Sequence, residues 1–131
     1  MKFFIIFYFI FFFKFSLNLF TNKPLKESLL DGKEIYNDFC AQCHLENGQG
    51  VKGIYPPLAK SDFLEDINLT ISSIKYGLKG PIKVNGEDYN SIMVSQGLDD
   101  EEISDVVNYI LNSWGNSTNK LITEEIVALI E

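Results

Sequence analysis

The most constraining feature of the sequence is the segment Cys40-Ala41-Gln42-Cys43-His44, which holds both cysteines and the single histidine of the 131-residue chain. Its two thiols lie about one helical turn apart, and an imidazole follows the second directly. A disulfide between Cys40 and Cys43 would close too small a loop to stabilise a fold usefully. We therefore expect the chain to fold around a group that these three side chains bind together.

Three kinds of site use such residues. Thioether bonds from Cys40 and Cys43 would tether one haem c by its two vinyl groups, with His44 as the proximal ligand of the iron. A zinc site needs four ligands, so a carboxylate would have to complete this set. A redox dithiol of the thioredoxin type is expected after a strand in a βαβ unit, which the sequence does not indicate. The spacing favours haem, with the zinc and dithiol sites as alternatives.

The composition limits which residue could be the second axial ligand of such a haem. With one histidine, a bis-histidine haem within one chain is excluded, and the only methionine outside the N-terminal segment is Met93. A methionine that merely fills a core is the alternative. Ligation by His44 and Met93 raises the reduction potential of the haem relative to bis-histidine ligation, and it closes the iron to small molecules. This ligand pair predicts an electron carrier rather than an enzyme.

The first 22 residues differ from the rest of the chain. Lys2 precedes an unbroken apolar run, Phe3 to Phe13, which has the length of a signal-peptide core and is short for a membrane span. We expect residues 1–22 to be a signal peptide or an uncleaved N-terminal anchor, and residues 23–131 to form an exported, periplasmic domain. That domain holds nine lysines against 18 carboxylates, a formal charge of −9. This balance argues against nucleic-acid binding and favours a docking partner with a basic surface.

Helical patterns recur between long loops. A polar linker is expected at 21–28, helices from Leu29 to the cysteines, at 68–76 and from Asp99 to Trp114, and a last helix at 123–131 within a C-terminal extension, 117–131. Residues 61–66 suggest a helical turn, and 45–60 and 81–98 read as irregular, with a brief β-like stretch at 82–84. The domain is therefore expected to be all-α.

Particular residues define these helices. Asp99 and Glu102 have the spacing of a capping box. The side chains expected on apolar faces are Leu30, Ile35, Tyr36 and Phe39 in the first helix, Leu69, Ile71 and Ile74 in the second, Ile103, Val106, Val107, Ile110 and Trp114 in the third, and Ile122, Ile126, Leu129 and Ile130 in the last.

From about Leu30 to the C-terminus, the chain resembles a class I cytochrome c. The resemblance rests on Gly32-x-x-x-Tyr36-x-x-x-Cys40-x-x-Cys43-His44, on Gly53-Ile54-Tyr55-Pro56-Pro57-Leu58 and on Tyr109. It implies three to five helices with long loops around one haem, and a close crossing of the first and last long helices at Gly32 and Tyr109. It also implies a proline carbonyl that accepts a hydrogen bond from His44, with Pro56 the best match and Pro57 the alternative.

A second part of the resemblance runs from Tyr76 to Asn116. Tyr76-Gly77-Leu78-Lys79-Gly80-Pro81-Ile82, Tyr89-Asn90 and Asn112-Ser113-Trp114-Gly115-Asn116 resemble small bacterial cytochromes associated with dehydrogenases or oxidases. This implies redox partner proteins of those kinds, and Tyr89 and Asn90 near the haem edge. Met93 departs from the family pattern, because Val94 follows it in place of proline. A haem subunit of a dehydrogenase and a gas-sensing haem protein are the alternatives. The side chains expected around the haem are Ile54, Leu58, Phe63, Ile92, Val106 and Ile110.

Overall fold

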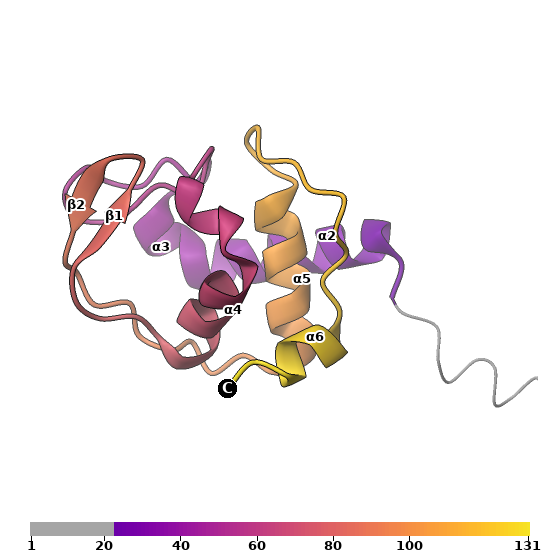
Figure 1. Ribbon diagram of the computed structural model, residues 1–131. Coiled ribbons are helices and arrows are strands. Elements are labelled where there is room, and N and C mark those ends of the chain that lie inside the picture. Colours follow the sequence, from indigo (N-terminus) through magenta and orange to yellow (C-terminus); the bar gives the residue numbers. More distant parts are fainter. Residues whose placement is uncertain (1–22) are drawn as a thin grey trace, which may run out of the picture.

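Helices linked by long loops form most of the structure, a computed structural model that describes residues 23–131 (Figure 1). The elements in order are α2 (Leu25–Ile35), a π-helical turn (Tyr36–Cys40), α3 (Ala41–His44), a 3₁₀ helix (Asp62–Glu65), α4 (Ile67–Tyr76), β1 (Ile82–Val84), β2 (Glu87–Tyr89), α5 (Asp100–Leu111) and α6 (Glu124–Ala128). The predicted helical fold with long loops is confirmed. Within these residues, no helix has both the length and the apolar character to cross a membrane. The predicted signal peptide or anchor lies outside the described residues.

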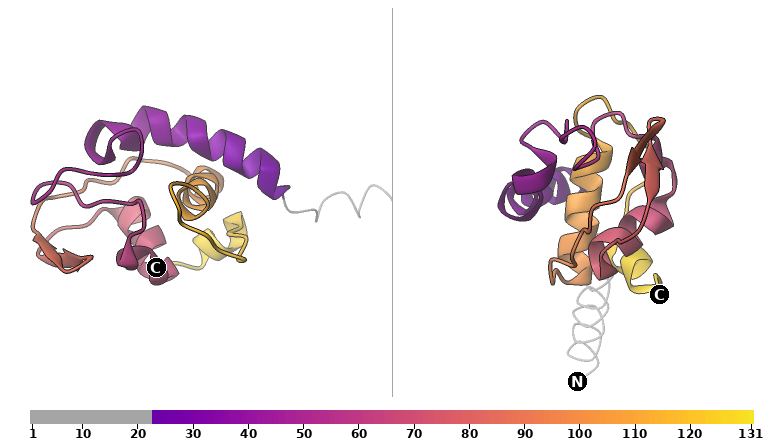
Figure 2. Two further views of the ribbon diagram at one scale, coloured as in Figure 1. Left: turned by 90° about the horizontal axis from the view of Figure 1, so that it is seen from above. Right: turned by 90° about the vertical axis from the view of Figure 1, so that its left-hand side faces the viewer.

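The close crossing of α2 and α5 organises the domain (Figure 2). A Cβ on Gly32 would lie 2.0 Å from the backbone oxygen of Asp105 and 2.9 Å from Cβ of Tyr109, so only glycine fits at this position. Beside the crossing, the Lys23 ammonium binds the buried Asp105 carboxylate at 2.7 Å and also contacts Asp31. The predicted crossing at Gly32 and Tyr109 is confirmed.

The buried face of α2 differs from the predicted one. The helix starts at Leu25, so the expected polar linker already includes its first turn, and Ser28, Gly32 and Tyr36 form its buried face. These residues follow one another every four positions, whereas Leu30 lies two positions from Gly32 and therefore on the opposite side. Leu30 is 60% exposed, and Phe39 is also exposed. The small residues are inside because the helices approach closely, and the expectation for Leu30 and Phe39 was wrong.

The capping box predicted at the start of α5 is present. The Glu102 amide donates to the Asp99 carboxylate, and the Asp99 amide donates to the Glu102 carboxylate, both at 2.9 Å. The helix ends at Leu111, earlier than expected, because Asn112 leaves the helical conformation and Trp114 adopts a positive φ of 53°. Trp114 still packs against the core, with its ring 4.8 Å from that of Tyr36.

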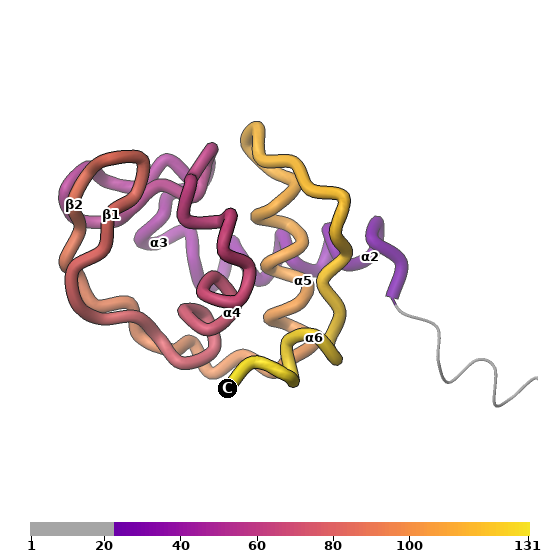
Figure 3. The backbone as a smooth tube through the Cα atoms, in the orientation of Figure 1, coloured from indigo at the N-terminus to yellow at the C-terminus, as the bar shows by residue number. Residues whose placement is uncertain are grey.

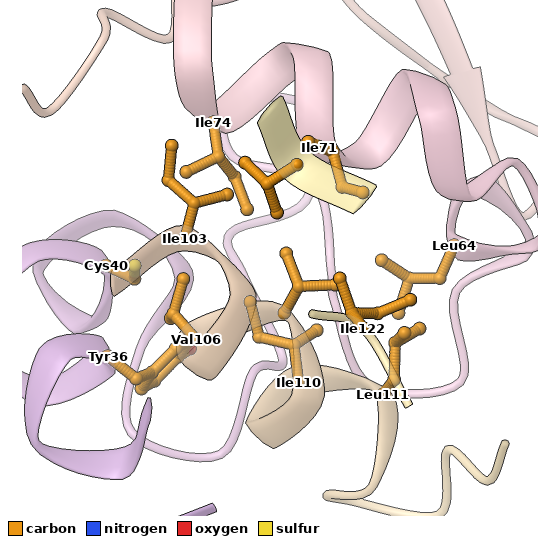
Figure 4. Packing of buried hydrophobic residues seen from close by; sticks show 12 residues of the cluster. Tyr36, Cys40, Leu64, Ile71, Ile74, Ile103, Val106, Ile110, Leu111 and Ile122 are labelled. Carbon is orange, nitrogen blue, oxygen red and sulfur yellow. The ribbon is translucent and has the colours of Figure 1, made fainter. Parts of the chain in front are cut away.

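The core lies between α4, α5 and the turn that leads into α3 (Figure 4). Ile74 of α4 lies beside Ile103 of α5, and Ile71 is buried in the same cluster, while Leu69, expected on the same face, is exposed. The segment at 81–98 contains more regular structure than predicted. Strands β1 and β2 form a hairpin in which Val84 pairs with Glu87. Asn85 and Gly86 both take positive φ in the connecting turn, a combination favoured in two-residue hairpin turns.

The C-terminal segment packs on its own domain. Residues 112–123 run back along α5 before α6 (Figure 3). Ile122 and Val127 are buried, whereas Ile126 and Leu129 are exposed, Leu129 by 80%. The predicted apolar face was therefore wrong for Ile126 and Leu129, because α6 is only one short turn and presents Val127 inward. Lys75 Nζ donates to the Val127 carbonyl at 3.0 Å and holds this turn against α4.

Candidate haem-binding site

The Cys40–His44 segment forms a turn of helix whose side chains share one cavity. Cys40 closes the π-helical turn, and Cys43 and His44 belong to α3. All three line the same hollow, and both thiols are free. Burial raises the pKa of the Cys40 thiol to about 12, and the neighbouring Cys43 adds to the shift. The two thiols and the imidazole face a hollow whose lining, among the residues that the structure describes, includes no lysine, aspartate or glutamate.

His44 is oriented by a backbone carbonyl. Its Nδ1 lies 2.9 Å from the oxygen of Pro56, while the residue is 8% exposed. Burial lowers the pKa of His44, and the hydrogen bond to Pro56 opposes that shift only in part. A neutral imidazole that donates from Nδ1 to the Pro56 carbonyl keeps the Nε2 lone pair for a metal. Of the two candidate prolines, the structure brings Pro56 to the histidine.

The loop that carries Pro56 is held by backbone contacts. The Gly50 amide donates to the His44 carbonyl at 2.9 Å, and Val51 and Tyr55 exchange two backbone hydrogen bonds of 2.8 Å. Gly50 has φ +63°, and a Cβ there would lie 2.7 Å from the Pro56 carbonyl oxygen. The sequence predicted an irregular segment at 45–60 without a particular role for Gly50. The closeness of Gly50 to the Pro56 carbonyl follows from how the loop folds back.

Met93 lies in the long loop between β2 and α5 and lines the same cavity as His44. Its backbone is fixed although Val94, not proline, follows it. Leu78 and Met93 exchange two backbone hydrogen bonds of 2.8 Å. Gly77, with φ +84°, fits against this bridge, since a Cβ there would lie 2.7 Å from the Met93 carbonyl oxygen. The pairing with Leu78 supplies a support that no sequence pattern indicated.

Two adjoining hollows form the cavity, an inner one of about 580 Å³ and an outer one of about 730 Å³, open mouths included. Both are lined by Cys40, His44, Pro56, Leu78, Ile82 and Met93. Mostly apolar walls, two thiols at one edge and an imidazole and a thioether beside them fit a covalently held porphyrin.

The remaining predicted wall residues divide into two groups. Leu58, Phe63 and Ile110 line the inner hollow, and Tyr89 and the largely exposed Ile92 line the outer one. Ile54 and Val106 line neither, so these two predictions were wrong. Ile54 is exposed in the loop, and Val106 faces the helix core instead. Asn90 is exposed. Wall residues not predicted include Ile74, Leu78, Ile82 and Val84.

A zinc site at Cys40, Cys43 and His44 would need a carboxylate as its fourth ligand. Across residues 23–131, no group of three or more histidine, cysteine, aspartate or glutamate side chains is placed to hold a metal ion. The required carboxylate is therefore not beside these three residues in this part of the chain.

Comparison with known proteins agrees with this geometry. Residues 29–114 match the cytochrome c family. Cytochrome c-552 of Thermus thermophilus is 43% identical over 96 residues, which cover 66% of this chain and 70% of the relative. A second cytochrome c-552 of Thermus thermophilus is also 43% identical, and the match covers 62% of its length.

Subunits of larger enzymes match over a similar number of residues. The cytochrome c subunit of alcohol dehydrogenase (quinone) of Gluconobacter oxydans is 30% identical over 91 residues, covering 66% of this chain. The fructose dehydrogenase cytochrome subunit of Gluconobacter japonicus is 31% identical over 93 residues, again 66% of this chain. The chain spans 19% of the length of each of these subunits. It therefore belongs to the cytochrome c family, and Cys40 and Cys43 carry one covalently attached haem c.

Proposed function

We propose that this protein is a carrier of single electrons, with His44 and Met93 as the two axial ligands of its haem iron. The observation that carries the proposal is that His44 and Met93 line one apolar cavity, each fixed through its backbone environment. Bound haem supplies an iron that alternates between the ferric and ferrous states. With both axial positions held by the protein, small molecules have no open site, and electrons pass without bond changes.

The residues around the cavity have separate roles in this proposal. Pro56 orients His44 and increases its electron donation by accepting the Nδ1 proton in a hydrogen bond. The bridge to Leu78 holds Met93 in place. The apolar walls exclude water, so little solvent has to rearrange when the charge of the iron changes.

The outer hollow is the side from which an electron would enter or leave. Exposed apolar side chains, Phe39, Ile92 and Val94, lie around it. Over residues 23–131 the excess of carboxylates over lysines favours a partner whose docking surface is basic, and docking should weaken with added salt. We propose that the chain is exported to the periplasm and exchanges electrons there with a dehydrogenase, a terminal oxidase or both.

A second candidate role is a haem subunit fixed within a dehydrogenase. The similarity to the cytochrome subunits of alcohol and fructose dehydrogenases supports it. Purification of the exported protein separates the two roles, because a subunit would remain bound to a larger enzyme at low and high salt.

The ligand assignment is tested on exported protein made with the cytochrome c maturation machinery. A pyridine haemochrome assay and intact mass report one covalent haem and the fate of residues 1–22. The ferric protein should show the weak sulfur-to-iron absorption band, and the ferrous protein should not bind carbon monoxide. Met93→Ala should lose the band and bind carbon monoxide, whereas Val94→Ala, at the exposed neighbouring position, should behave as wild type. Ready binding of carbon monoxide by the wild type would instead favour a gas-binding haem protein.

A further inference from the structure

Ser61 carries a buried hydroxyl for which the described residues provide no hydrogen-bond partner. The residue is 7% exposed, lines the inner hollow of the haem cavity, and its Oγ is unpaired. Buried polar groups are nearly always hydrogen-bonded, so this hydroxyl calls for an explanation.

The local structure does not explain the hydroxyl. Ser61 directly precedes the 3₁₀ helix, where a serine usually caps the helix, but its side chain makes no capping bond. The backbone is tied down on both sides of it. The Lys60 amide donates to the Asn116 side chain at 2.8 Å, and the Asp62 amide donates to the Asn85 side chain at 3.0 Å. The fold therefore fixes Ser61 against the cavity wall without using its oxygen.

The other hydroxyls of the inner hollow are already engaged. Thr70 donates to the Asp66 carbonyl at 2.9 Å, and Ser73 donates to the Leu69 carbonyl at 2.7 Å. Both are ordinary bonds to the preceding helical turn. Among the hydroxyl side chains that line this hollow in residues 23–131, Ser61 is the one still free to bind a cofactor.

We propose that the Ser61 hydroxyl donates a hydrogen bond to a propionate carboxylate of the haem. The propionates are the polar groups of an otherwise apolar macrocycle, and they lie on the edge away from the two thioether bonds. A carboxylate is also the acceptor that a buried hydroxyl binds most strongly. The proposal rests on haem attachment at Cys40 and Cys43 and does not depend on Met93.

A second observation supports a polar group at this point. Ser61 and Leu64 also line a separate hollow on the protein surface, with the polar side chains of Glu65, Asn116, Ser117, Thr118 and Lys120. Ser61 thus stands between the apolar cavity and a polar, solvent-facing region. A propionate that reaches Ser61 would have its charge near solvent, where an ionised carboxylate is tolerated.

The test compares Ser61→Ala with Ser104→Ala in the haem-loaded protein. Ser104 is a buried serine of α5 that donates to the Glu101 carbonyl at 2.8 Å and lines neither hollow of the haem cavity. Two readouts report on the propionates directly: their hyperfine-shifted methylene resonances in the proton NMR spectrum of the ferric protein, and their carboxylate bands in the redox infrared difference spectrum. Ser61→Ala should shift both. It should also lower the reduction potential. Without the hydrogen bond, more negative charge remains on the propionate, and this charge stabilises ferric iron. Ser104→Ala should leave all three unchanged, and Ser61→Thr, which retains a hydroxyl, should keep the wild-type infrared bands.

The proposal is overturned if Ser61→Ala matches the wild type, if Ser104→Ala produces equal shifts, or if Ser61→Thr shifts the bands as far as alanine does. The sulfur-to-iron band is recorded in the same samples. If the wild type lacks this band, ligation of the iron by Met93 is contradicted. The comparison of the propionate signals between the variants remains valid in that case.

Discussion

Replacing Asn108 with alanine should cost this protein a large part of its stability. Asn108 lies on α5 and is 0% exposed. Its side-chain amide donates to Ser28 Oγ at 2.9 Å and to the Ile122 carbonyl at 2.8 Å, while its oxygen accepts from the Ile122 amide at 2.9 Å. One side chain therefore joins three segments: α2, α5 and the stretch of chain before α6.

The size of the expected stability loss follows from the hydrogen bonds that alanine cannot make. Three hydrogen bonds at a net value of about 0.5–1.5 kcal/mol each give roughly 1.5–4.5 kcal/mol, and unpaired buried groups add to the cost. We expect Asn108→Ala to lower the free energy of unfolding by about 3–5 kcal/mol, out of a total of about 5–15 kcal/mol for a typical domain. With a urea m-value of about 1–3 kcal/mol/M, the midpoint should fall by more than about 1 M.

The assay is urea unfolding of the haem-loaded protein, followed by far-UV circular dichroism. Asn68→Ala, an exposed asparagine on α4, is the matched control and should change stability by less than about 0.5 kcal/mol. Asn108→Leu keeps the volume but not the hydrogen bonds and should remain clearly destabilised. Amide hydrogen exchange at Ile122 should accelerate in both Asn108 variants. A loss under about 1 kcal/mol in Asn108→Ala, or a leucine variant as stable as wild type, would refute the hydrogen-bond argument.

Three further substitutions test other parts of the structure. Gly77→Ala should displace Met93 and weaken the sulfur-to-iron band, because the new Cβ would meet the Met93 carbonyl and the backbone φ is positive; an unchanged band would contradict this. Gly50→Ala should push the Pro56 carbonyl away from the histidine and raise the reduction potential, since a less electron-rich imidazole favours ferrous iron; spectroelectrochemistry would detect the shift. Lys23→Met should destabilise the protein by about 3 kcal/mol at pH 7, because it leaves a buried aspartate without its cation. Burial opposes the charge of Lys23, but the hydrogen bonds that the ammonium donates to its acidic partners outweigh this effect and raise the pKa of Lys23. Its contribution is therefore complete below the unfolded pKa of about 10.4 and disappears as pH rises through the higher folded value, so the difference between variant and wild type should shrink only in strongly alkaline urea titrations.

The sequence predicted those features whose signal lies within a few neighbouring residues. The Cys40–His44 spacing identified the haem attachment, because both thiols and the imidazole belong to one helical turn. Asp99 and Glu102 identified the start of α5, because a capping box joins residues three positions apart. The cross-helix role of Gly32 came from the family resemblance rather than from periodicity.

Other features depended on contacts between distant segments, which residue spacing does not encode. Only the folded loop distinguishes Pro56 from Pro57 as the hydrogen-bond acceptor of His44, because it places the carbonyl of Pro56 next to the imidazole. The burial of Ser28 instead of Leu30 follows from how closely α5 approaches α2. The sequence around Met93 and Val94 could not predict that Leu78 supports Met93. The two residues are joined by backbone hydrogen bonds, which require no particular side chain.

The sequence by itself therefore determined the cofactor, the single histidine of the chain, and Met93 as the only methionine among residues 23–131. The tertiary structure decided which carbonyl orients His44, what holds Met93, and that the hydroxyl of Ser61 is left free at the cavity wall. Covalent attachment is a local property of five consecutive residues. The environment of the attached group is made by loops that come from distant parts of the chain, and it exists only once the helices have packed.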